Sequence, residues 1–174
     1  MPVRNLILMR HATAAAGTGR DIDRPLTRRG VDEAHRVGER LRVDGPIPDR
    51  VLCSTAQRCR ETWRSLATGL GADSLPAIDV AYDDDLYDAS TSGLLDVIQS
   101  EQDAAVVLVL AHNPGISLLA VELGRGDPDF ESALREGFTP ASLAVFAIDD
   151  GWSALSPATA RCLRFERPDR DDVG

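Results

Sequence analysis

Two residues that could act together on an anion follow a short apolar run near the start of the sequence. The run covers residues 6–9, and Arg10 and His11 come directly after it. Arginine carries a permanent charge and planar N–H donors that match phosphate oxygens. Histidine can serve as a nucleophile or a proton carrier near neutral pH. The pair could therefore bind and attack a phosphoryl group, although a strand followed by an ordinary charged turn explains the stretch equally well.

A second histidine and a further arginine also follow apolar runs. His112 stands directly after residues 104–111, a continuous run dominated by valine, leucine and alanine. If both runs are parallel strands of one sheet, His11 and His112 lie at the same edge, where open α/β sheets bind ligands. Arg58 opens an expected helix, whose free N–H groups favour an anion, so a bound phosphate would offset the arginine charge. Alternatively, Arg58 belongs to a solvated face and pairs with Glu61.

Two other basic side chains have less clear roles. Arg24 lies in the loop that starts beside His11 and could fold back over the site. It could equally form an ion pair with Asp21 or Asp23, and the sequence leaves both readings open. His35 lies mid-helix among charged residues, so we expect it on a solvated face.

Other phosphate and cofactor chemistries do not fit the spacing. Four residues separate Cys53 from Arg58 and six separate it from Arg60, and neither spacing suits the phosphate-wrapping loop of cysteine phosphatases. A cysteine that ends an apolar strand is also usually inert. The glycine motifs of nucleotide-binding loops are absent, and no ligand set has metal-site spacing. The sequence therefore predicts neither a metal nor a cofactor.

The elements that must position these residues alternate between short apolar strands and helices as far as about residue 124. A polar connection is expected over 124–137, and a turn at 149–151 leads into a strand at 152–155. This order predicts a three-layer α/β/α sandwich whose mostly parallel sheet ends in an antiparallel hairpin. We expect one domain over residues 1–174, with a flexible tail after about residue 166. The predicted strands are 6–9, 51–53, 78–82, 104–111, 143–148 and 162–165; the predicted helices start at Thr27, Ala56, Ser90 and Ile116.

Composition limits the partners and the compartment. The formal net charge is -9, which disfavours nucleic acid and anionic membrane surfaces as partners. No apolar run approaches the ~20 residues of a membrane span, and residues 6–9 are too few for a signal peptide. Three cysteines without paired spacing suit a reducing compartment. We therefore expect a cytoplasmic protein, and the sequence makes no prediction of its oligomeric state.

Taken together, these motifs resemble the histidine phosphatase superfamily, and most of all its small SixA-type phosphohistidine phosphatases. The resemblance implies a phosphoglycerate mutase-like fold. It also implies that His11 takes up the phosphoryl group, that Arg10, Arg58 and His112 hold the phosphate, and that Arg24 joins them. The matching segments are Leu8-Met9-Arg10-His11-Ala12, Arg24-Pro25-Leu26-Thr27 with Gly30, Ser54-Thr55-Ala56-Gln57-Arg58 with Glu61-Thr62, Ala111-His112-Asn113-Pro114 and Phe138-Thr139-Pro140-Ala141-Ser142.

The sequence departs from the family pattern at two places. Ala12 stands where the family usually has glycine, which is tolerable only if this position has a negative φ. Relatives that cleave phosphoesters carry a carboxylic general acid in the loop after the third strand. Here that loop offers several aspartates, and we name Asp85 because it directly precedes Leu86-Tyr87. The other candidates are Asp83, Asp84 and Asp88.

These observations predict a metal-independent phosphatase that works through a phosphohistidine intermediate on His11. An N–P bond is labile once the leaving nitrogen is protonated, so an ambiguous general acid fits a phosphohistidine protein substrate. The first alternative is a phosphatase of small phosphomonoesters such as sugar or glycerate phosphates. The second is a phosphate-binding module without catalysis, against which the full set of arginines and histidines argues.

Overall fold

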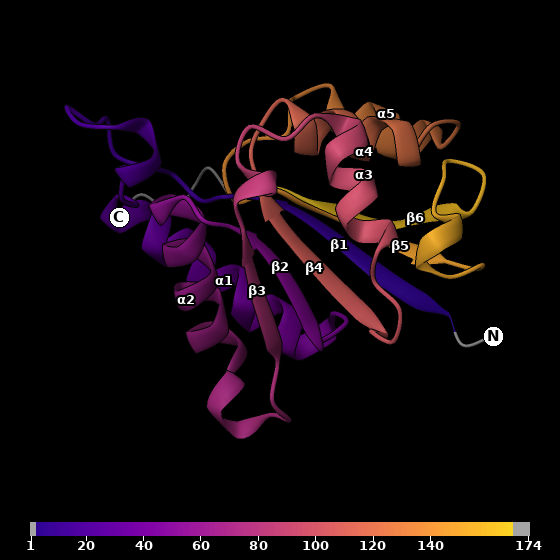
Figure 1. Cartoon of the computed structure of the whole chain (residues 1–174), viewed down its shortest axis with the longest axis horizontal. Helices are drawn as coiled ribbons and strands as arrows, with labels where there is room; N and C mark the ends of the chain where they lie inside the picture. The colour runs from indigo at the N-terminus through magenta and orange to yellow at the C-terminus, as the bar shows by residue number, and fades with distance from the viewer. Residues whose placement is uncertain (1–2, 169–174) are drawn as a thin grey trace.

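Apolar segments of the chain form a six-stranded sheet with the order β3-β2-β4-β1-β5-β6. The structure, a computed structural model, describes residues 3–168 (Figure 1). Four strands are parallel and the last two run antiparallel, which confirms the mostly parallel sheet. The strands are β1 (Arg4–Arg10), β2 (Arg50–Ser54), β3 (Asp79–Asp83), β4 (Val106–Ala111), β5 (Leu143–Ile148) and β6 (Ala160–Glu166).

The sheet separates two apolar cores, which explains why β1 and β4 read as continuous apolar runs. Leu6 and Leu8 of β1 enter one core, while Ile7 and Met9 enter the other, because successive strand side chains point to opposite faces. Helices cover both faces, so residues 6–9 of β1 and 107–111 of β4 are buried. This confirms the predicted three-layer arrangement (Figure 1).

Helices α1 (Arg28–Asp44) and α2 (Gln57–Leu70) cover one face, and α3 (Thr91–Gln99) and α4 (Gly115–Leu123) cover the other. The predicted caps are present: Thr27 accepts a hydrogen bond from Gly30 N, and Ser90 accepts one from Gly93 N. Helices α1 and α2 approach closely through Gly38 and Gly69. A Cβ at Gly38 would overlap the carbonyl oxygen of Leu66. This contact helps to fix α2, which carries Arg58, against the rest of the layer.

Two sequence predictions after residue 124 are wrong. The connection predicted as polar contains α5 (Pro128–Leu134), whose N-cap Asp127 accepts hydrogen bonds from two backbone N–H groups. Its buried Phe130 packs against the sheet, which a pattern dominated by polar residues concealed. The strand predicted at 152–155 is a short 3₁₀ turn, because Trp152 is buried and donates to Ala104 O. The strand paired with β5 is β6 instead.

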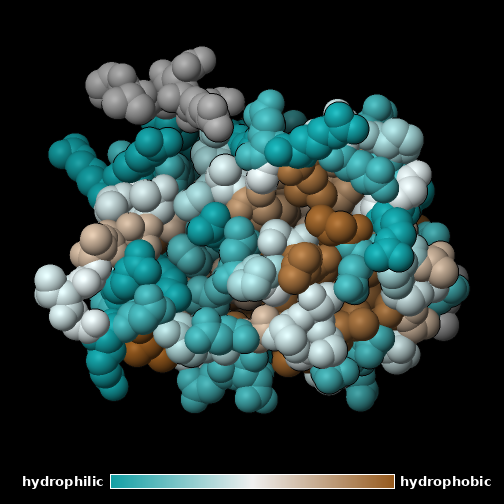
Figure 2. Space-filling model, turned by 90° about the horizontal axis from the view of Figure 1, so that it is seen from above, coloured by the Kyte–Doolittle hydropathy of each residue, from teal (hydrophilic) through white to brown (hydrophobic). Residues whose placement is uncertain are grey.

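Polar and apolar surfaces are segregated on the face seen from above. Apolar side chains gather on the side of α4 and α5, and hydrophilic side chains surround them (Figure 2). On α4, Leu118 and Val121 are about half exposed. No helix within residues 3–168 is long and apolar enough to cross a membrane. The tail predicted to be flexible lies outside the described residues from 169 onward, and β6 continues to Glu166.

Candidate active site

The two histidines that follow apolar strands lie side by side. Strands β1 and β4 are parallel neighbours with Arg10 opposite Ala111, so His11 and His112 leave the sheet at the same level (Figure 1). Their ring centroids are 5.2 Å apart. His11 N donates to Ala111 O, which clamps the residue after β1 onto β4. The edge predicted from the sequence is therefore the place where the two side chains meet.

The environment of His11 keeps its ring neutral. Its Nδ1 lies 2.8 Å from the carbonyl oxygen of Ala12, and because a carbonyl only accepts, Nδ1 carries the proton. Nε2 then keeps its lone pair. Burial lowers the pKa of His11 most, and together with the positive charges of Arg58, Arg10 and Arg24 it brings this pKa to about 4. At neutral pH the ring is therefore uncharged and can attack phosphorus.

The backbone beside His11 is held by α2. Ala12 N donates to Thr62 Oγ1 at 3.0 Å, and the same hydroxyl donates to Arg58 O at 2.6 Å. In residues 3–168 the non-glycine positions with positive φ are Asp88 and Ala141. Ala12 is not one of them, so it meets the condition under which alanine can replace the usual glycine. The hydrogen bond from Ala12 N to Thr62 Oγ1 therefore helps to fix the backbone of Ala12, whose carbonyl oxygen sets the tautomer of His11.

Arg58 lies in the first turn of α2, as predicted, but its charge is offset by Asp21, which the sequence analysis considered only as a partner of Arg24. Nη1 donates to the carbonyl oxygen of Asp21 at 2.7 Å, and Nη2 donates to its Oδ2 at 3.0 Å. Tyr87 donates its hydroxyl proton to the same Oδ2 at 2.7 Å. Arg24 donates to Oδ1 at 3.0 Å, which answers the open question of its partner. Asp21, and not Glu61, is therefore the carboxylate that pairs with Arg58, and Asp21, and not Asp23, pairs with Arg24.

Arg10 contributes a second guanidinium from the end of β1. Its Nη1 donates to Phe138 O at 3.1 Å, and Asn113 Nδ2 donates to the same oxygen at 3.0 Å. These bonds tie Phe138, the first residue of a segment that resembles the family, to the ends of β1 and β4. Arg10 Nε is buried and has no hydrogen-bond partner within residues 3–168. A buried donor without a partner is costly, so it suits an anionic ligand.

His112 also has a buried ring nitrogen that makes no hydrogen bond to the described residues. Its Nε2 lies 2.8 Å from Ser54 Oγ, and its Nδ1 is buried without a partner among the described residues. When Ser54 donates its proton to Nε2, Nδ1 carries the ring proton and can donate to a phosphoryl oxygen. Burial, followed by the positive charge of Arg58, lowers the pKa of His112 to about 3. A neutral His112 is therefore a hydrogen-bond donor and not a cation.

Several motif residues hold the loops around the cluster in place. Glu61 accepts from Leu26 N at 2.7 Å and from Gln57 Nε2 at 2.8 Å, which ties the loop of Arg24 to α2. Gly30 lies so close to the loop that an added Cβ would overlap Thr13 O. Glu61 and Gly30 therefore serve the close packing of the loops around the strand ends.

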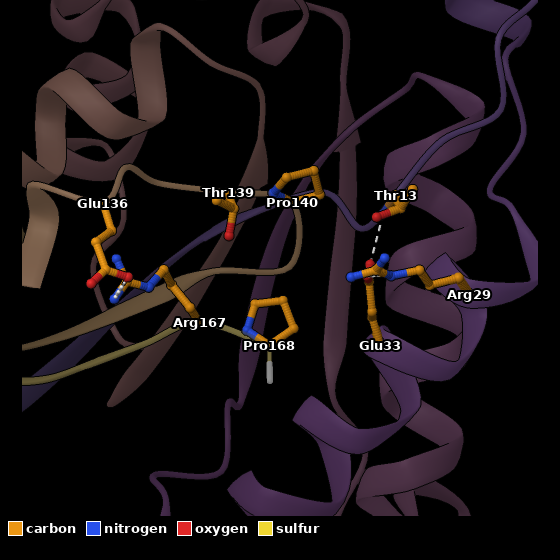
Figure 3. Close-up of a pocket in the computed structure, with 8 residues that line it drawn as sticks. All are labelled: Thr13, Arg29, Glu33, Glu136, Thr139, Pro140, Arg167 and Pro168. Carbon is orange, nitrogen blue, oxygen red and sulfur yellow. Dashed lines mark hydrogen bonds and ion pairs between the residues drawn. The ribbon is translucent and has the colours of Figure 1, made fainter. Parts of the chain in front are cut away.

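A cavity of about 370 Å³ lies beside this loop but outside the cluster around His11. Figure 3 shows Thr13, Arg29 and Glu33 on one side of it and residues of the 136–140 and 167–168 segments on the other. Its glutamates are paired, Glu33 with Arg29 and Glu136 with Arg167, each at 2.8 Å. Glu33 also accepts from Thr13 N. The cavity therefore neighbours the candidate active site without sharing its charged groups.

The remaining candidates from the sequence lie away from the cluster. Asp85 is exposed in a 3₁₀ turn, and no hydrogen bond or ion pair joins its side chain to the cluster in the described part of the chain. Its role as a general acid stays a prediction. His35 is partly exposed beside Glu39, as expected. Cys53 is fully buried, and burial raises the pKa of its thiol well above the usual range, which agrees with setting cysteine chemistry aside.

Sequence reasoning missed two residues of the cluster, Asp21 and Tyr87. Tyr87 packs edge-on against His112 with ring centroids 5.4 Å apart. The Cζ atom of Arg58 lies 5.8 Å from the centroid of the Tyr87 ring. Asp21 precedes the Arg24 motif, and Tyr87 follows the acidic loop. A signal was present for Asp21, since it was one of two possible partners of Arg24. Nothing local in the sequence distinguished Tyr87.

Metal ligands are not gathered anywhere in the part of the chain that the structure describes. Within residues 3–168, no group of three or more histidine, cysteine, aspartate or glutamate side chains is placed to hold a metal ion. The positive charge around His11 comes from Arg10, Arg24 and Arg58 instead. Metal independence itself stays a prediction for experiment.

Comparison with known proteins identifies the class to which this site belongs. The family model of the histidine phosphatase superfamily (branch 1) matches residues 6–94. An uncharacterized protein of Mycobacterium tuberculosis is 35% identical over 165 residues, which cover 92% of this chain and 99% of that protein. The chain belongs to the histidine phosphatase superfamily, and it is a phosphatase.

Within the superfamily, the chain is similar to SixA proteins. Phosphohistidine phosphatase SixA of Escherichia coli is 28% identical over 149 residues, covering 83% of this chain and 86% of that protein. The solved structure of a candidate phosphohistidine phosphatase SixA from Nakamurella multipartitia superposes with a TM-score of 0.83. That pair is 32% identical, and the match covers 97% of this chain and 98% of the other.

Proposed function

We propose that this phosphatase hydrolyses phosphohistidine in a protein through a covalent phosphohistidine on His11. One observation carries the proposal: a neutral His11 keeps its Nε2 lone pair among the charges of Arg10, Arg24 and Arg58. Phosphoryl transfer needs an in-line nucleophile and positive charge around the equatorial oxygens, and little else from the protein. The cluster supplies both from side chains alone.

The reaction runs in two steps. In the first, His11 Nε2 forms a bond to phosphorus while the bond from phosphorus to the substrate imidazole nitrogen breaks. That nitrogen leaves with the bonding electron pair, and the other nitrogen of the substrate ring carries a proton taken from solvent, so the ring departs as neutral imidazole. In the second, a water oxygen bonds to phosphorus, the bond from Nε2 breaks, and the proton released by water passes to phosphate or solvent. Arg10 Nε, Arg58 and His112 Nδ1 donate to the phosphoryl oxygens in both steps.

Within residues 3–168, the carboxylate that bonds to the arginines of the cluster is ionised, which favours a nitrogen leaving group. Asp21 is the carboxylate among the arginines, and hydrogen bonds from Tyr87 and Arg24 hold its pKa well below the usual range. It is therefore ionised at neutral pH and has no proton to give. An alkoxide leaving group needs such a proton, whereas an imidazole leaving group can be protonated beforehand by solvent at its other ring nitrogen. The names of the SixA relatives point to the same substrate class.

The test compares a panel of substrates with the full-length chain. We expect turnover of phosphohistidine proteins at a higher kcat/KM than sugar or glycerate phosphates, and loss of turnover in His11→Ala. Labelled substrate should leave an acid-labile, alkali-stable adduct on His11. Preferential turnover of a sugar or glycerate phosphate would establish the small-molecule alternative. A fully active His11→Ala variant would exclude the proposed intermediate.

A further inference from the structure

Asp21 joins three separate parts of the cluster. It lies in a 3₁₀ turn (Asp21–Asp23) of the loop between β1 and α1. Its carboxylate accepts from Arg24 in the same loop, from Arg58 at the start of α2 and from Tyr87 after β3. The side chain of Asp21 is 52% exposed, whereas that of Arg58 is 6% exposed. An exposed loop residue therefore determines how a buried guanidinium is oriented.

The contacts with Asp21 leave room for a phosphoryl group. A guanidinium has five N–H donors. Arg58 gives Asp21 one donor from each terminal nitrogen, so three of its N–H groups make no bond to Asp21. Arg24 uses Nε for Ala15 O and one donor of Nη1 for Asp21. Both guanidiniums can therefore bind phosphate without releasing the carboxylate.

The charge of Asp21 also matches the cluster to its ligand. Arg10, Arg24 and Arg58 all act on His11, and together with Asp21 they leave a net charge of +2. A phosphoryl group carries about −1.5 to −2 at neutral pH. Without the carboxylate, Arg58 and Arg24 would repel each other with nothing between them. Asp21 offsets this repulsion and keeps both side chains on the same side of the site.

We propose that Asp21 is a positioning residue of this phosphatase, whose carboxylate stays on Arg24 and Arg58 during turnover and holds both guanidiniums toward the phosphoryl group. This proposal rests on the phosphatase function proposed above. It assigns Asp21 no proton transfer and no contact with the reacting atoms. Its effect should therefore appear in the rate of the chemical step more than in the strength of substrate binding, because misplaced arginines stabilise the transition state poorly.

The decisive variant is Asp21→Asn, which keeps the size of the side chain and removes its charge. We expect kcat toward an aryl phosphate and a phosphohistidine protein to fall about tenfold or more, with a smaller change in KM and an unchanged melting temperature. The matched control is Asp23→Asn. Asp23 lies in the same turn but pairs with Arg20, whose side chain is 79% exposed, so this variant should retain the wild-type kcat.

A second variant tests the position of the carboxylate without changing its charge. Tyr87→Phe removes one hydrogen bond to Asp21, so we expect a smaller fall in kcat than in Asp21→Asn. If Tyr87 acts through Asp21, the double variant should be no slower than Asp21→Asn alone, because coupled residues are not additive.

Each other outcome has a definite reading. Wild-type kcat in Asp21→Asn overturns the positioning role, whether or not the melting temperature falls. A lower KM with unchanged kcat and tighter inhibition by inorganic phosphate also overturns it, because Asp21 would then compete with substrate for Arg58. A wild-type chain that hydrolyses neither substrate overturns the proposed function instead, so the two failures are distinguishable.

Discussion

The substitution Arg58→Ala separates catalysis from architecture, and its two effects can be estimated from the contacts of Arg58. The guanidinium is a candidate donor to the phosphoryl oxygens, and removing one such preorganised donor typically costs about 3 kcal/mol of transition-state stabilisation. That corresponds to a loss of roughly a hundredfold or more in kcat/KM. The structural loss is smaller. The partner Asp21 is half exposed, so solvent screens the pair and its contribution to stability is about 1 kcal/mol or less.

The assay measures kcat/KM with an aryl phosphate and the melting temperature with and without inorganic phosphate. For a chain of this size, 1 kcal/mol shifts the melting temperature by about 2–4 °C. We therefore expect a variant that melts within a few degrees of wild type, has lost roughly a hundredfold or more in rate, and is stabilised less by phosphate. Arg58→Lys should recover part of the binding but little of the rate, because lysine keeps the charge and lacks the planar fork.

The matched control is Arg64→Ala, which removes an exposed arginine from the same helix and should leave rate and stability unchanged. A variant Arg58→Ala that keeps its rate within about threefold of wild type and melts much earlier would refute the reasoning. In that case Arg58 would serve the fold by pairing with Asp21, and the phosphate would be held elsewhere.

Three further predictions concern pH, metal and the backbone beside the nucleophile. Because burial lowers the pKa of His11 to about 4, kcat/KM corrected for substrate ionisation should persist as the pH falls from 7 to about 5 and decline through about 4, where Nε2 takes up a proton; a decline centred near 6.5 would contradict this. A chelator should not change the rate, since arginines supply the positive charge; loss of activity that zinc or magnesium restores would overturn metal independence. Thr62→Val leaves the buried Ala12 N–H unpaired, so we expect a loss of about 1–3 kcal/mol in unfolding free energy and a lower kcat. Urea unfolding and steady-state kinetics would check this, and unchanged values for both would contradict it.

Much of the fold follows from local patterns along the chain. Residues 6–9 and 106–111 are apolar at every position because β1 and β4 are covered on both faces, and such runs are typical of parallel strands. Thr27 and Ser90 predict helix starts because their hydroxyls can accept from N–H groups that have no partner in the helix. Where burial depended on distant partners, prediction failed. Trp152 packs in the core, where its indole N–H donates to Ala104 O. Phe130, which stands among polar residues in the sequence, packs in the same core against the sheet.

The sequence by itself predicted that His11, His112 and Arg58 gather at one edge of the sheet. His11 and His112 end neighbouring parallel strands, and Arg58 opens the helix after another, so strand direction alone brings them to one edge. Only the tertiary structure decided how they are held. Asp21 meets Arg58 across 37 positions and Tyr87 across 66, and Thr62 meets Ala12 across 50. The physical reason is that strand and helix periods are set by neighbouring residues, whereas the partner of a buried charge or N–H group is set by the packing of loops and helices from distant parts of the chain.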